Sequence, residues 1–96
     1  MNKKVIIESV IKEDALGNLM PFLECNLSVV REFDGCLGVR VFLDKESRKM
    51  IFDEEWTSVE QHQEYLRFIA GNGVMENLVS FLESSPKIKY FDRLEI

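Results

Sequence analysis

The stretch over residues 49–69, which reads KMIFDEEWTSVEQHQEYLRFI, constrains what this chain can fold into more than any other part of it. Its first half alternates with a period of two, which is typical of a β-strand. One face of that strand carries Met50, Phe52, Glu54 and Trp56, and the other carries Ile51, Asp53 and Glu55. The stretch therefore begins with a strand that ends at Trp56.

A helix is expected directly after this strand. Ser58 and Gln61 have the spacing of a capping box, which satisfies free backbone N–H groups in a first helical turn. The pair Thr57 and Glu60 has the same spacing. Inward-facing positions then recur at helical spacing, at Val59, His62, Leu66 and Ile69. The chain's single Trp and single His thus flank one strand-to-helix corner, where we expect any functional site.

Composition bounds the class of protein. Ninety-six residues suit one domain, and a net charge of −5 disfavours nucleic acid as a partner, because phosphate contacts need a basic patch. Scattered Lys and Arg residues disfavour an anionic membrane surface, and the sequence lacks both a membrane-span-length apolar run and a signal-peptide core, so we expect a cytoplasmic protein. One His and the two distant cysteines, Cys25 and Cys36, offer no metal-ligand spacing, so we expect no metal.

The rest of the chain predicts three further strands and two further helices. The strands are expected at 3–11, 36–43 and 88–95, and the helices at 20–33 and 74–82. Pro21 suits a first helical turn, so we expect a short irregular turn before the main helix, with Asp14 as its N-cap. Gly35 suits a left-handed cap at the end of that helix.

This β-α-β-β-α-β order predicts an α+β fold of the ferredoxin-like type. Such a fold has a four-stranded antiparallel sheet with its helices on one face. Because the predicted strands carry apolar residues on both faces, a partner must cover the face without helices. A second copy of the chain is the simplest partner, so we expect a homodimer.

Three features in this order carry a resemblance to a known family. Residues 33–38 read FDGCLG after the first helix, residues 52–56 read FDEEW before the second, and Pro86 precedes the last strand. Over nearly all of residues 1–96, a single domain, the chain resembles the antibiotic biosynthesis monooxygenase family of dimeric α/β-barrel proteins. The resemblance implies sheet-to-sheet homodimers, a cavity between sheet and helices, and oxidation of small quinols or anthrones by O2 without any cofactor.

The match to the family is partial at the site. Trp56 matches the family's Trp at the strand end, but the position nine residues later, where many members have His, is Tyr65 here. The haem-degrading branch needs an Asn in the first strand, and residues 6–9 contain none, so that branch ranks last.

The candidate catalytic residues are His62 and Glu54. A neutral imidazole can take a proton from a phenol, and a carboxylate in an apolar cavity has a raised pKa and can act as a base. Two structural interpretations compete with these roles. His62 can be a core residue bonded to a backbone carbonyl or to Glu54, and Glu54 can form an ion pair with Arg40.

The candidate substrate-binding residues are aromatic. They are Trp56, Tyr65, Phe52 and Phe68. For Trp56, a role as a core anchor between sheet and helix is the stronger interpretation, although stacking on an aromatic ligand is compatible with it.

The sequence thus predicts a cofactor-independent monooxygenase acting on a small aromatic molecule. Two other classes stay open, because fold does not fix function. One is a non-catalytic ligand-binding or regulatory dimer, and the other is an isomerase or lyase acting on a small carbonyl compound.

Overall fold

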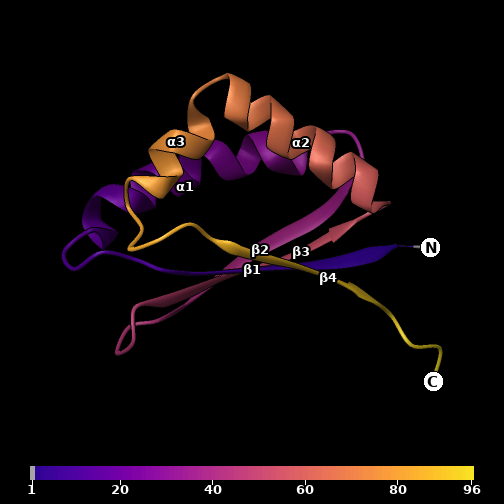
Figure 1. Cartoon of the computed structure of the whole chain (residues 1–96), viewed down its shortest axis with the longest axis horizontal. Helices are drawn as coiled ribbons and strands as arrows, with labels where there is room; N and C mark the ends of the chain where they lie inside the picture. Colours follow the sequence, from indigo (N-terminus) through magenta and orange to yellow (C-terminus); the bar gives the residue numbers. More distant parts are fainter. Residues whose placement is uncertain (1) are drawn as a thin grey trace.

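The computed structural model describes residues 2–96 as one twisted sheet with all three helices over the same face (Figure 1). The elements are, in order, β1 (Lys3–Val10), α1 (Leu16–Arg31), β2 (Cys36–Asp44), β3 (Lys49–Trp56), α2 (Val59–Gly71), α3 (Val74–Val79) and β4 (Lys87–Asp92). The four strands lie in the order β2-β3-β1-β4, and each neighbouring pair is antiparallel. The predicted ferredoxin-like order is confirmed.

The strand-to-helix corner forms as its sequence pattern predicts. All four residues on the inner face of β3 are buried: Met50, Phe52, Glu54 and Trp56. Ser58 is the N-cap of α2, and its Oγ accepts a hydrogen bond from the backbone N–H of Gln61 at 3.1 Å. The alternation of the strand and the cap of the helix together fix which side chains point into the space between sheet and helices.

The first helix differs from its prediction at both ends. It begins at Leu16 and continues through Pro21. Because Pro21 has no N–H, the carbonyl of Gly17 lacks its helical hydrogen bond, but Gly17 is exposed, so water can reach that carbonyl. The expectation that Asp14 caps it is wrong, because the N-cap is Ala15 without a side-chain bond. Gly35 is left-handed, with φ +93°, but it lies in the turn to β2, beyond the C-cap at Glu32.

The C-terminal elements are shorter than predicted. Helix α3 ends at Val79, and Leu82, expected to be helical, forms an isolated β-bridge with Ile11. Strand β4 ends at Asp92, so Leu94 lies beyond it and is exposed.

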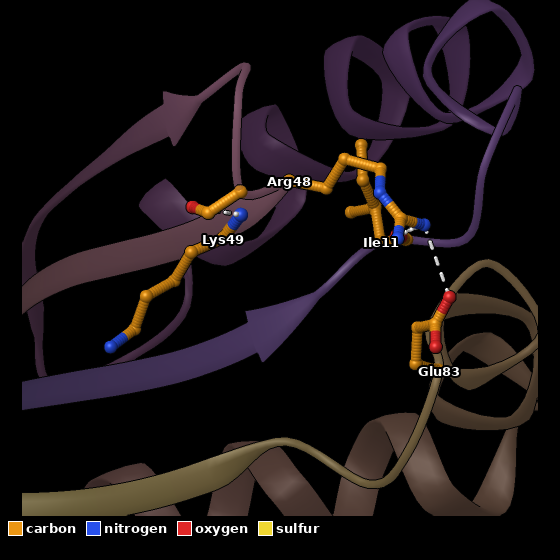
Figure 2. Close-up of polar contacts among 5 residues, drawn as sticks. Ile11, Arg48, Lys49 and Glu83 are labelled. Atoms are coloured by element: carbon orange, nitrogen blue, oxygen red, sulfur yellow. Dashed lines mark hydrogen bonds and ion pairs between the residues drawn. The ribbon is translucent and has the colours of Figure 1, made fainter.

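Arg48 ties three segments together at the hairpin end of the sheet (Figure 2). Its Nη1 donates to the carbonyl oxygen of Ile11 and pairs with Oε2 of Glu83, both at 3.1 Å. The backbone N–H of Ile11 donates in return to the carbonyl of Arg48 at 2.9 Å. The end of β1, the β2–β3 turn and the segment after α3 are thereby held at the end of β3 opposite to Trp56.

The outer face of the sheet carries both ion pairs and exposed aromatic rings. Asp53 Oδ1 lies 2.7 Å from Lys4 Nζ, and Phe42 and Phe91 are 53% and 47% exposed. Among the helices described, none is long and apolar enough to cross a membrane.

Candidate active site

Glu54 is a carboxyl group buried among apolar neighbours. It is 4% exposed, and the register of the sheet places it between Val5 of β1 and Val39 of β2. Its Oε1 accepts a hydrogen bond from Trp56 Nε1 at 2.8 Å. Burial raises the pKa of Glu54 to about 7, an effect that the indole N–H reduces and the charge of Asp53 slightly increases.

The proposed ion pair between Glu54 and Arg40 does not form. The β2–β3 register pairs Arg40 with Asp53, which points to the outer face of the sheet, and Arg40 is exposed. Within residues 2–96 no permanently charged cation pairs with Glu54, so burial dominates its pKa.

His62 is on α2, and its side chain lies next to that of Glu54. It is 1% exposed, and its Nε2 lies 3.6 Å from Glu54 Oε1. Its Nδ1 lies 2.8 Å from the hydroxyl oxygen of Tyr90 on β4. Burial lowers the pKa of His62 to about 4, so the imidazole is neutral at pH 7. The hydrogen-bonding partner of His62 is thus a tyrosine, in place of the backbone carbonyl or the Glu54 carboxyl that was expected for a core His, and Glu54 lies just beyond hydrogen-bond distance.

Trp56 contacts both Glu54 and His62. It is fully buried, its ring packs edge-on against His62 with centroids 5.2 Å apart, and it also packs against Tyr65 at 5.7 Å. Trp56 does not line the cavity described next, so its position is that of a core anchor that also donates to Glu54. Phe68 is half exposed, packs on Phe33 at 5.5 Å and lies outside the cavity as well.

A cavity of about 50 Å³ lies between the sheet and the helices. Glu54, His62 and Tyr65 line it together with Phe52, so four of the six candidate site residues meet there. Burial raises the pKa of Tyr65 to about 12, so its hydroxyl stays protonated. The other walls are almost entirely apolar and come from β1, β4 and all three helices. The site is therefore a largely apolar space with a titratable pair at one wall.

The cavity is too small in this structure for an aromatic ring. An apolar cavity needs roughly 150 Å³ to take up a benzene ring, so an aromatic ligand requires the walls to separate. Helix α3 contributes Val74, Met75 and Leu78 to the lining, has no buried residue and follows the break at Gly71–Gly73. Of the three helices in the lining it is the one without a buried residue, so it is the helix that separates from the sheet at the least cost.

Sequence reasoning missed two polar residues of the site. Tyr90 was expected only as a residue of the last strand, although its alternation with Ile88 placed it on the inner face. Asn26 of α1 lines the cavity and donates its Nδ2 to the carbonyl of Phe22 at 2.9 Å. The signal for Asn26 was its place between Leu23 and Val30 in the apolar stripe.

No metal-binding cluster is found within residues 2–96. No group of three or more His, Cys, Asp or Glu side chains in that range is arranged to hold an ion. Both cysteines are free, and burial raises the pKa of Cys36, which keeps its thiol protonated and unsuited as a ligand.

Comparison with known proteins defines the fold. No protein-family model matches the chain, and no curated protein matches it in sequence. Among solved structures, it is similar to Rv0793 from Mycobacterium tuberculosis, with a TM-score of 0.82 and 16% identity over 100% of this chain and 98% of that one. A conserved protein from Methanosarcina mazei Go1 gives a TM-score of 0.85 and 15% identity, covering 98% and 94% of the two chains.

A third structure connects the fold with a named class. It is described as an antibiotic biosynthesis monooxygenase, and it matches with a TM-score of 0.83 and 18% identity, covering 96% of this chain and 98% of that one. The chain therefore has the fold of antibiotic biosynthesis monooxygenases, as its motifs indicated. At this level of identity the likeness concerns the fold alone.

Proposed function

We propose that this protein is a cytoplasmic, cofactor-independent monooxygenase that oxidises a small quinol- or anthrone-type aromatic compound with O2. The observation that carries the proposal is the buried Glu54–His62 pair, which faces an apolar cavity. A buried carboxyl with a pKa of about 7 is matched to taking a proton near neutral pH. The fold shared with named monooxygenases supports the same reaction class.

Few other protein groups are needed for this reaction. The pair removes a proton from the substrate, and the resulting electron-rich anion reduces O2 directly. One oxygen atom enters the product, and for an anthrone the other leaves as water with the two hydrogens of the oxidised carbon. The apolar walls, among them Phe52 and Leu66, hold the aromatic ring and exclude bulk water, which favours proton transfer to the buried group.

A homodimer through the outer sheet face is part of the proposal. Phe42 and Phe91 expose about half of their surface there, and Leu37 on β2 is 51% exposed. The face without helices thus exposes apolar side chains on both of its edge strands, β2 and β4, and a second copy can cover them. The ion pair of Lys4 with Asp53 lies between them on the central strands β1 and β3, so a second copy would cover charges that are already paired.

The direct experiment is oxygen uptake against a panel of quinols and anthrones, with and without a metal chelator. We expect substrate-dependent uptake that the chelator leaves unchanged. Saturable ligand binding without uptake would instead identify a ligand-binding dimer. Product formation under nitrogen would identify an isomerase or lyase. Either outcome would overturn the proposed reaction.

A further inference from the structure

The hydroxyl of Tyr90 reaches the active-site pair from the far edge of the sheet. Tyr90 lies opposite Val5 in the β1–β4 ladder, and Val5 lies opposite Glu54 in the β1–β3 ladder. Tyr90 and Glu54 are thus on the same face, one strand apart, and the ring of His62 spans the gap between them. Its Nδ1 is 2.8 Å from the Tyr90 oxygen and its Nε2 is 3.6 Å from Glu54 Oε1.

The neighbouring contacts decide which ring nitrogen carries the hydrogen. Trp56 Nε1 can only donate, so Glu54 Oε1 acts as an acceptor at 2.8 Å. A lone pair on Nε2 of His62 would face that same oxygen and be repelled by it. The favourable arrangement therefore places the hydrogen on Nε2. A neutral imidazole has one N–H, so Nδ1 must then accept, and the phenol of Tyr90 must donate.

The protonation of Tyr90 agrees with this direction. Burial raises the pKa of its phenol, an effect that a hydrogen bond with the side chain of Gln63 reduces, so the hydroxyl keeps its hydrogen and can donate at every pH near neutral. The O–H of Tyr90 and the N–H of His62 then both point one way, toward Glu54, whose Oε1 lies 3.6 Å from Nε2. An aligned set of donors of this kind stabilises the charged form of the carboxylate at its end.

We propose that Tyr90 is a positioning residue that holds His62 in the Nε2–H tautomer and so leaves Glu54, rather than His62, as the acceptor of the substrate's proton. In this tautomer Nε2 carries a hydrogen and Nδ1 is occupied by the phenol, so the neutral ring has no lone pair free for a substrate. The assignment of the tautomer does not depend on the proposed function, whereas the assignment of Glu54 as the base rests on the proposed function.

The tautomer is directly measurable, because His62 is the one histidine in the chain. Nitrogen-15 NMR of the imidazole at pH 7 should show a proton bonded to Nε2 and an Nδ1 signal typical of a hydrogen-bonded acceptor. In Tyr90→Phe the Nδ1–H form should become populated, so the Nδ1 signal should move upfield and the Nε2 signal downfield, toward each other. Tyr65→Phe is the matched control. It removes a hydroxyl from the same cavity region, but no hydrogen bond joins it to His62, so the signal should stay.

The opposite results would refute the role of Tyr90. A proton bonded to Nδ1 in the wild type would mean that His62 donates to Tyr90. An Nδ1 signal that Tyr90→Phe leaves unchanged, or moves only downfield, would mean that the phenol does not set the tautomer.

Turnover tests the second half of the proposal. Tyr90→Phe should lower kcat by about tenfold, in the range found when the partner that orients a functional His is removed, with KM changed less than about threefold. His62→Gln keeps an N–H donor for Glu54 and should lose about tenfold as well, whereas Glu54→Gln should lose roughly 10²–10⁴. An equal, large loss in His62→Gln would make His62 the base. If the wild type shows no uptake with any substrate, the base assignment fails with the proposed function, while a proton on Nε2 still supports the role of Tyr90.

Discussion

Glu54 and Asp53 are neighbours on β3, yet they lie in opposite environments. Asp53 faces outward, where its Oδ1 is 2.7 Å from Lys4 Nζ and water reaches both side chains. Glu54 faces inward, where it meets an indole N–H and a neutral imidazole in place of a cation. The side of the sheet, set by the two-residue period of the strand, thus decides whether a carboxylate is a solvated charge or a candidate base.

The two positions also differ in what they do for stability. An exposed pair such as Asp53 with Lys4 contributes between about 0 and 1 kcal/mol. Burial of Glu54 raises its pKa from 4.5 to about 7, which opposes folding by about 3 kcal/mol once the group is ionised. A cost of this size at a cavity wall is typical of functional sites, where perturbed pKa values cluster.

The largest expected contrast between the two faces is in turnover. Glu54→Gln removes the proton acceptor and should lower kcat by roughly 10²–10⁴. Asp53→Asn makes the same chemical change one residue away, on the outer face, and should change kcat by less than about twofold. Steady-state oxygen uptake on both variants checks this. Comparable losses in the two variants would remove the distinction between the faces.

The second contrast is in folding stability. Trp56 is fully buried against Phe33, Tyr65 and His62, so Trp56→Ala should lower the free energy of unfolding by about 3–5 kcal/mol. Phe42 on the outer face is half exposed, and Phe42→Ala should cost less than about 1.5 kcal/mol. Urea denaturation of the two variants at one protein concentration gives both values. A small loss for Trp56→Ala would show that the corner is not a core anchor.

The third contrast is in the pH dependence of stability. Glu54 has a higher pKa in the folded state, so its contribution is present at low pH and is lost as the pH rises from 4.5 to about 7. His62 has a lower folded pKa, so its contribution grows as the pH rises from about 4 to 6.5. Over the pH range that the two shifts share, the folded and unfolded states hold the same number of protons on Glu54 and His62. The two contributions to the pH dependence of stability therefore cancel.

Glu54→Gln should reveal the pH dependence of the free energy of unfolding that comes from His62, because the opposing contribution of Glu54 is removed. With His62 alone, the free energy of unfolding should rise by about 3 kcal/mol between pH 4 and 6.5, relative to the wild type. Asp53→Asn should show the same pH dependence of the free energy of unfolding as the wild type over this range. Urea titrations at three pH values across the window measure it, and a Glu54→Gln profile parallel to the wild type would argue against a buried neutral His62.

The smallest expected effect concerns the outer face. Phe42→Lys places a charge in the proposed interface and should weaken the dimer by about 10- to 100-fold in dissociation constant. Val29→Lys is the control, because Val29 is similarly exposed at 45% but lies on α1, away from that face. Sedimentation over a concentration series reports both. A wild type that is monomeric at micromolar concentration contradicts the dimer itself.

Local sequence signals predicted the architecture and the corner because they act over a few residues. The alternation of β3 and the Ser58 cap needed only the strand and helix periods. Pro21 misled the prediction of the helix start, because the lost hydrogen bond falls at an exposed turn that tolerates it.

The contacts of the site depended on long-range register and could not be predicted in this way. Residues 45–48 form the hairpin turn and set Asp44 opposite Lys49, which places Arg40 beside Asp53 and away from Glu54. Tyr90 is 28 residues from His62, and the two meet only because β1 lies between β3 and β4.

The most direct test of a proton acceptor poised at the corner is the titration of the Glu54 carboxyl itself. Carbon-13 NMR of carboxyl-labelled glutamate, with Glu54→Gln to assign the signal, follows this group from pH 3 to 9. We expect a midpoint near 7, because the carboxyl is buried and has no charged cation paired with it among residues 2–96. A midpoint at the ordinary value of 4.5 would show that the group is solvated or paired, and would contradict the account.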